Sequence, residues 1–118
     1  MGIRVGYVNV QGLSVASWRA CCALLHHTFD YLFVAETWFV DHARHSQDRR
    51  FVTSTKLGPA NRRGRHRGGI YLLGTHDAHS RVAGIVVTEY SITFSCDGRS
   101  FLGVYFPPAT LSLDDLGD

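Results

Sequence analysis

The first 35 residues carry a strand–helix–strand pattern, which restricts the possible folds more than any other feature of the chain. Residues 4–10 alternate, with Val5, Tyr7 and Asn9 on one face, as expected for a strand. Behind Ser14, a favourable N-cap, apolar residues recur at steps of three and four up to position 29, which indicates an amphipathic helix. Residues 31–35 (YLFVA) are all apolar, as in a strand buried on both faces. Because a crossover helix joins them, the two strands are predicted to be parallel.

The rest of the chain consists of short strand-like segments separated by polar or glycine-containing segments. Polar residues 40–50 predict a loop or a short irregular helix, and residues 76–79 (HDAH) predict a turn. Asp97-Gly98 is a strong signal for a tight hairpin turn. Further strands are predicted at residues 51–57, 70–73, 81–89, 91–96 and 101–106. We therefore expect an α/β (α+β) fold with one twisted mixed sheet, covered by the crossover helix on one face and without an obvious cover on the other.

Size and composition predict one soluble, intracellular domain. The chain has 118 residues, 45% of them hydrophobic and 19% charged, which is usual for a globular protein. No stretch approaches the ~18 apolar residues that a membrane span needs, so no membrane partner is expected. Of the 12 lysines and arginines, all but one are arginines. Guanidinium groups match phosphate oxygens, so this bias fits a phosphate-rich partner, although compositional bias of the coding genome explains it equally well.

The three cysteines, Cys21, Cys22 and Cys96, do not form a disulfide pattern, because two are adjacent and the number is odd. Cys22 and His26 lie four residues apart, but no second pair follows at the spacing of a zinc site. The cysteines are therefore predicted to be small, buried apolar residues.

Two polar residues end the two predicted parallel strands, Asn9 in the first and Glu36 directly after the second. Ligands bind beyond the carboxyl ends of parallel strands, and Mg²⁺ prefers oxygen ligands such as a carboxylate and an amide carbonyl. Spacing alone leaves a plainer alternative open, in which Glu36 is simply solvated and Asn9 starts a turn through its own side-chain hydrogen bond.

Four short motifs resemble the endonuclease/exonuclease/phosphatase (deoxyribonuclease I-like) superfamily. They are YVNVQGL at residues 7–13, AETW at 35–38, GGI at 68–70 and VYFPP at 104–108, and they stand in the order of that family. The Gln-Gly-Leu and Glu-Thr-Trp variants are most similar to endonuclease domains of non-LTR retrotransposons. The resemblance covers nearly the whole chain and implies the N-terminal half of a four-layer α/β sandwich.

The resemblance also implies roles for three residues. Glu36 would bind a divalent metal, Mg²⁺ or alternatively Mn²⁺, and Asn9 beside it would orient the metal shell or the phosphate. Tyr105 would direct its hydroxyl at the phosphate and stabilise developing charge. The implied activity is a metal-dependent phosphodiesterase, an endonuclease acting on DNA or on another phosphodiester, and nuclear if it derives from a retrotransposon.

Two motifs of the resembled family do not occur, an aspartate-asparagine pair and a C-terminal serine-aspartate-histidine. They supply the base that activates water, so residues 1–118 are expected to be a partial domain, truncated before its C-terminal half and inactive alone. The missing C-terminal half is then an expected partner. A degenerate, non-catalytic nucleic-acid-binding remnant and another phosphoesterase of the same fold remain as alternatives.

A basic loop offers a second candidate for contact with nucleic acid. It contains Arg62, Arg63, Arg65 and Arg67 among glycines, a composition that suits phosphate contacts. A solvated surface loop is the alternative of equal weight. Two histidines, His76 and His79, are close in sequence, but their place in a predicted turn makes a metal site there the weaker interpretation.

Overall fold

A computed structural model describes residues 2–56 and 68–105 of the chain. In this part, the strands β1 (Val5–Asn9), β2 (Tyr31–Ala35), β4 (Ile70–Gly74) and β3 (Phe51–Ser54) form one sheet in the order β1-β2-β4-β3. The strands β5 (Val82–Val87), β6 (Ser91–Cys96) and β7 (Arg99–Val104) form a second sheet in sequence order. The fold is a mixed α/β structure with few helices, in agreement with the predicted class.

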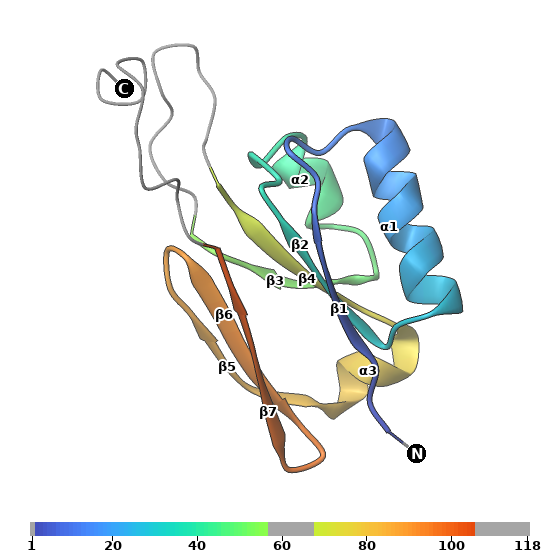
Figure 1. Cartoon of the computed structure of the whole chain (residues 1–118), viewed down its shortest axis with the longest axis vertical. Helices are drawn as coiled ribbons and strands as arrows, with labels where there is room; N and C mark the ends of the chain where they lie inside the picture. The colour runs from blue at the N-terminus through green and yellow to red at the C-terminus, as the bar shows by residue number, and fades with distance from the viewer. Residues whose placement is uncertain (1, 57–67, 106–118) are drawn as a thin grey trace.

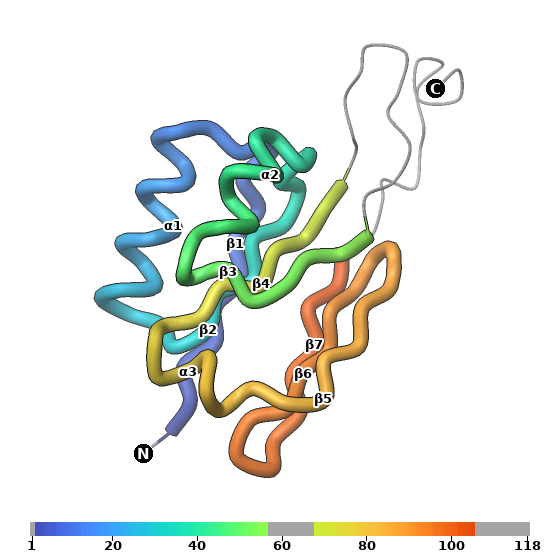
Figure 2. Tube along the Cα trace, turned by 180° about the vertical axis from the view of Figure 1, so that it is seen from behind, coloured from blue at the N-terminus to red at the C-terminus, as the bar shows by residue number. Residues whose placement is uncertain are grey.

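The described elements lie in three layers. Figure 1 shows the helix α1 (Val15–His27) on one side of the four-stranded sheet and β5–β7 on the other, and Figure 2 shows the same order from behind. The prediction of a single sheet is therefore wrong, and so is that of an uncovered second face. The strands predicted to extend the first sheet instead fold back over it and bury its other face.

The β1-α1-β2 unit forms as predicted, because its local signals agree with one another. Ser14 caps α1 through its side chain, which accepts a hydrogen bond from the backbone of Ser17, while the Ser17 hydroxyl accepts one from Ser14 N. The strands β1 and β2 pair in parallel, with Asn9 opposite Ala35. The β2–β4, β3–β4, β5–β6 and β6–β7 pairs are antiparallel, which confirms the predicted parallel start and antiparallel remainder.

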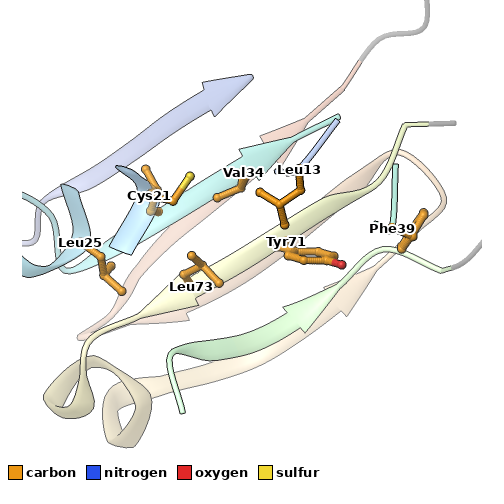
Figure 3. Close-up of a cluster of buried hydrophobic side chains, with 8 residues drawn as sticks. Leu13, Cys21, Leu25, Val34, Phe39, Tyr71 and Leu73 are labelled. Atoms are coloured by element: carbon orange, nitrogen blue, oxygen red, sulfur yellow. The ribbon is translucent and has the colours of Figure 1, made fainter. Parts of the chain in front are cut away.

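The apolar run of β2 is buried on both faces, as predicted for residues 31–35. Leu32 and Val34 point towards α1, where the cluster drawn in Figure 3 packs Cys21 and Leu25 of the helix against Tyr71 and Leu73 of β4. Tyr31 and Phe33 point the other way, into the cluster between the two sheets. Both faces of one five-residue strand are therefore needed to hold the three layers together.

The contact between the two sheets is built from aromatic side chains. Phe94 of β6 is completely buried, with its ring 4.6 Å from that of Tyr31 and 5.8 Å from that of Phe33. The Phe33 ring lies over Gly103 of β7, where a Cβ atom would approach it to 2.4 Å. Burial in β6 alternates strictly, with Ile92, Phe94 and Cys96 inside. A side chain at position 103 would push the sheets apart, so glycine sets their close spacing.

Local structure departs from the predictions at two places. Residues 76–79, predicted as a turn, belong to a short helix, α3 (His76–Arg81), which Thr75 caps by accepting from Ala78 N. The polar segment from 40 to 50 contains only the four-residue helix α2 (His42–His45), within the two predicted alternatives. The hairpin turn at Asp97-Gly98 is confirmed, with φ of 52° and 78° at its two residues. Among the described residues, no helix is long and apolar enough to cross a membrane.

Alkaline pH should destabilise the fold partly through Tyr71. Burial raises the pKa of this phenol from 10.0 to about 12, so the folded state keeps the proton while the unfolded state loses it. This contribution to stability is present below pH 10 and is lost as the pH rises towards 12. Between pH 9 and 12 the free energy of unfolding should fall less in Tyr71→Phe than in the unchanged chain. We expect the difference to be on the order of 1 kcal/mol. Urea denaturation at each pH measures it, and equal pH slopes for both proteins would contradict it.

Candidate active site at the carboxyl ends of β1 and β2

Glu36 follows the last residue of β2 and is held by the backbone on both sides. Gly12 N donates to the Glu36 carbonyl at 2.7 Å, and Leu13 N donates to the Thr37 carbonyl at 3.1 Å. On the opposite side, Thr37 N and Trp38 N donate to the carbonyls of Gly69 and Gly68. The segment that carries Glu36 thus continues the backbone pairing of the sheet. It lies between the motif at residues 7–13 and the motif at residues 68–70.

The glycine pair before β4 allows this close approach. Gly69 has a φ of +85°, and a Cβ atom there would lie 2.6 Å from Thr37 Oγ1 and 2.9 Å from the Phe39 ring. Gly68 lies beside the ring of Tyr105, to which a Cβ atom would come within 3.5 Å. Three of the four sequence motifs therefore meet the fourth, around Glu36, at one end of the structure.

Tyr105 reaches the same carboxylate from the second sheet. Its hydroxyl donates to Glu36 Oε1 at 3.0 Å, and both side chains are half-buried. Tyr105 N donates to the Tyr90 carbonyl at 2.9 Å, which fixes the backbone beyond the end of β7. Two residues separated by 69 positions in the chain are thus joined directly.

Asn9 lies at the end of β1, opposite Ala35 and one residue from the level of Glu36. Its side chain is exposed, and Oδ1 accepts a hydrogen bond from Gln11 N at 3.1 Å. This is the turn-forming contact that the plainer interpretation of the sequence anticipates. An amide oxygen has two lone pairs, so this contact leaves the Asn9 side chain able to accept a second bond.

Tyr7 belongs to this cluster, although the sequence did not single it out. Its hydroxyl donates to the Val104 carbonyl at 3.1 Å, which ties β1 to the residue before Tyr105. Burial and then the negative charge of Glu36 raise the pKa of the Tyr7 phenol. The available signal was its strand position, because side chains two residues apart share a face and Asn9 is already a candidate.

The backbone around Glu36 is strained. Gln11, Glu36, Trp38 and Phe39 have φ between 49° and 55°, in the left-handed region that residues with a Cβ atom rarely adopt. Each costs roughly 1–3 kcal/mol and persists only where the surrounding structure enforces it. Strain of this kind concentrates at functional sites, which favours the Glu36 segment as one of them.

A metal at this end would have few protein ligands. In the part of the chain that the structure describes, no three His, Cys, Asp or Glu side chains come together as a metal-binding group. Glu36 is the carboxylate at the site, with the amide of Asn9 at the neighbouring strand end. This donor set suits Mg²⁺ or Mn²⁺, which bind through one or two carboxylates plus water and phosphate, and does not suit a structural zinc.

The other candidates lie elsewhere. Arg62, Arg63, Arg65 and Arg67 fall outside the described residues. His76 and His79 lie in α3, which begins two residues after Gly74. Gly74 pairs with Tyr31, at the opposite end of β2 from Glu36. Comparisons with protein-family models, curated proteins and solved structures gave no match.

Proposed function

We propose that this chain is the N-terminal part of a metal-dependent phosphodiesterase, an endonuclease acting on DNA. The observation that carries the proposal is the hydrogen bond from the Tyr105 hydroxyl to Glu36, at the end where β1 presents Asn9. Such a cluster of a carboxylate, an amide and a phenol beyond the carboxyl ends of parallel strands suits a phosphate and its cation. The order of the four sequence motifs, most similar to those of retrotransposon endonucleases, gives the proposal its direction.

In this proposal each side chain has a definite task. Glu36 holds Mg²⁺ or Mn²⁺, which when bound polarises the scissile phosphate and stabilises the leaving oxygen. Tyr105 donates to one carboxylate oxygen of Glu36 and so fixes the orientation of the carboxylate that would hold the cation. Tyr7 holds Tyr105 in place through the Val104 carbonyl, and Asn9 would orient the phosphate or the metal shell through its amide.

The proposed domain is a four-layer sandwich of which the described residues make three layers. The outer surface of the second sheet supports a further layer, because Val86 and Leu102, which flank Thr93 on its outward face, expose 58% and 61% of their surface. Monomeric proteins rarely expose large contiguous apolar patches, and exposed apolar side chains on a sheet face are suited to contact with a covering layer. The C-terminal half of the domain is the proposed cover, and it would bring the base that activates water.

The test is Mg²⁺-dependent nicking of supercoiled plasmid by a polypeptide in which this chain is continued through the second half of such a domain. Glu36→Ala should reduce the nicking rate by at least about 100-fold, because the metal loses its carboxylate. Equal nicking by both proteins would rule out the assignment of Glu36. The non-catalytic alternative predicts salt-dependent DNA binding without nicking, weakened by Arg62, Arg63 and Arg65→Ala.

A further inference from the structure

A pocket of about 300 Å³ lies at the other end of the four-stranded sheet from Glu36. Its apolar part comes from Cys22 and Leu25 of α1, and its polar part includes the side chains of His26, Arg49, Arg50 and His76. The strand pairing fixes its distance from the candidate active site: Gly74, which lines the pocket, pairs with Tyr31, whereas Ala35 precedes Glu36. The proposed nuclease function makes no use of this pocket.

The charges around the pocket are unbalanced. Two arginines and two histidines line it, and none of the described carboxylates does. Asp48 is the counter-charge of Arg50, and both of its oxygens accept from Nη1 of Arg50, at 3.2 Å and 3.0 Å. Arg49 is exposed and forms no ion pair with the described residues. Among the described residues, the positive charge of Arg49 therefore has no ion-pair partner, even before the histidines take up protons.

We propose that this pocket binds a terminal phosphate group, a phosphate monoester of a small molecule or of a polynucleotide end. Arginine guanidinium groups bind the oxygens of a phosphate in bidentate fashion. Arg50 contacts Asp48 through Nη1, and its Nη2 donates no hydrogen bond to Asp48. The volume is at the lower limit of small-molecule sites, enough for a phosphate with its first sugar. Leu25 and Cys22 supply the apolar wall on which that sugar lies.

The Cys22 thiol gives a direct measure of occupancy. Cys21 and Cys96 are buried, whereas Cys22 is half-buried and lines the pocket. Burial raises the pKa of the Cys22 thiol, and of the two charges near it Arg50 lowers this pKa while Asp48 raises it. Alkylation of Cys22 by neutral iodoacetamide, followed by peptide mass spectrometry, should slow when an anion fills the space.

The experiment uses the 118-residue chain with inorganic phosphate, at an ionic strength matched by chloride. We expect Cys22 alkylation to slow about tenfold once phosphate is at about ten times its Kd. Arg49→Gln should weaken the protection about tenfold, whereas Arg99→Gln on the second sheet should leave it unchanged. Phosphate that gives no more protection than chloride, or protection that survives Arg49→Gln, would overturn the proposal.

Two oligothymidines distinguish the sources of the phosphate. Protection by the 5′-phosphorylated strand but not by its 5′-hydroxyl counterpart identifies a polynucleotide end as a ligand. Protection by ribose 5-phosphate alone identifies a small ester, which also supports the proposal. Equal protection by both oligothymidines would mean that internal phosphodiesters bind through charge alone, and the assignment to a terminal phosphate would be wrong.

Discussion

Replacing Glu36 with glutamine should weaken Mn²⁺ binding to the chain by at least about tenfold. Mn²⁺ takes carboxylate, carbonyl and water oxygens, so it reports on the site proposed for Mg²⁺. Glutamine keeps the shape of the side chain and can accept from the Tyr105 hydroxyl, but it lacks the negative charge that binds the cation. Titration of the chain with Mn²⁺, following free Mn²⁺ by electron paramagnetic resonance, measures the change in Kd.

A matched control is available within the same chain. Glu89 is exposed in the turn between β5 and β6, so Glu89→Gln removes the same charge from the second sheet while Glu36 and its hydrogen bond to Tyr105 stay in place. We expect Glu89→Gln to bind Mn²⁺ as the unchanged chain does. If the two variants lose affinity equally, the binding reflects net charge, and Glu36 is not the metal ligand.

Local sequence patterns predict which face of a strand is buried, but not the sheet to which the strand belongs. The alternation in β1 predicted that Val5, Tyr7 and Asn9 share a face, and Val5 indeed packs into the core between the sheets, while Val8 packs towards α1. The same period of two in β6 says which of its side chains are inside, but not which sheet they cover. Strands of a second sheet and of an extended first sheet have the same pattern, so the sequence could not separate them.

The helix α3 was missed for a related reason. Six residues make fewer than two turns, too few for a recurring apolar face, and a single buried residue, Ala78, anchors it. The cap was a usable signal, because Thr75 stands two residues before Asp77, a pattern of helix starts. This helix carries the chain from β4 into the second sheet, which explains why the turn and the single sheet were predicted together.

The part of the candidate site that lies at strand ends could be predicted from the sequence. The part that depends on contacts between distant residues could not. Asn9 and Glu36 follow from the ends of two parallel strands. Tyr105 was named only through the resemblance, because its place beside Glu36 depends on the packing of the two sheets. The contribution of Tyr7 depends on its contact with Val104, 97 residues away, which no local pattern encodes.

Replacing Phe94 with alanine should lower the free energy of unfolding by about 3–5 kcal/mol, the largest stability effect we expect from one substitution. The ring is completely buried and contacts the rings of Tyr31, Phe33 and Phe101. Its removal leaves a cavity between the two sheets that the aromatic neighbours fill only in part. Small domains are stable by only about 5–15 kcal/mol, so the loss is a large share of the total.

Urea denaturation followed by tryptophan fluorescence and by circular dichroism measures the loss. Leu102→Ala on β7 is the matched control, because this side chain is 61% exposed and should contribute less than about 0.5 kcal/mol. Phe94→Leu keeps part of the volume and should lose about 1 kcal/mol, which preserves the test if the alanine variant does not fold. Because only packing of the second sheet onto the first buries Phe94, losses at Phe94 no larger than that at Leu102 would mean that the sheets do not pack face to face. The contact of Tyr105 with Glu36 would then lose its structural basis, since it depends on the same packing.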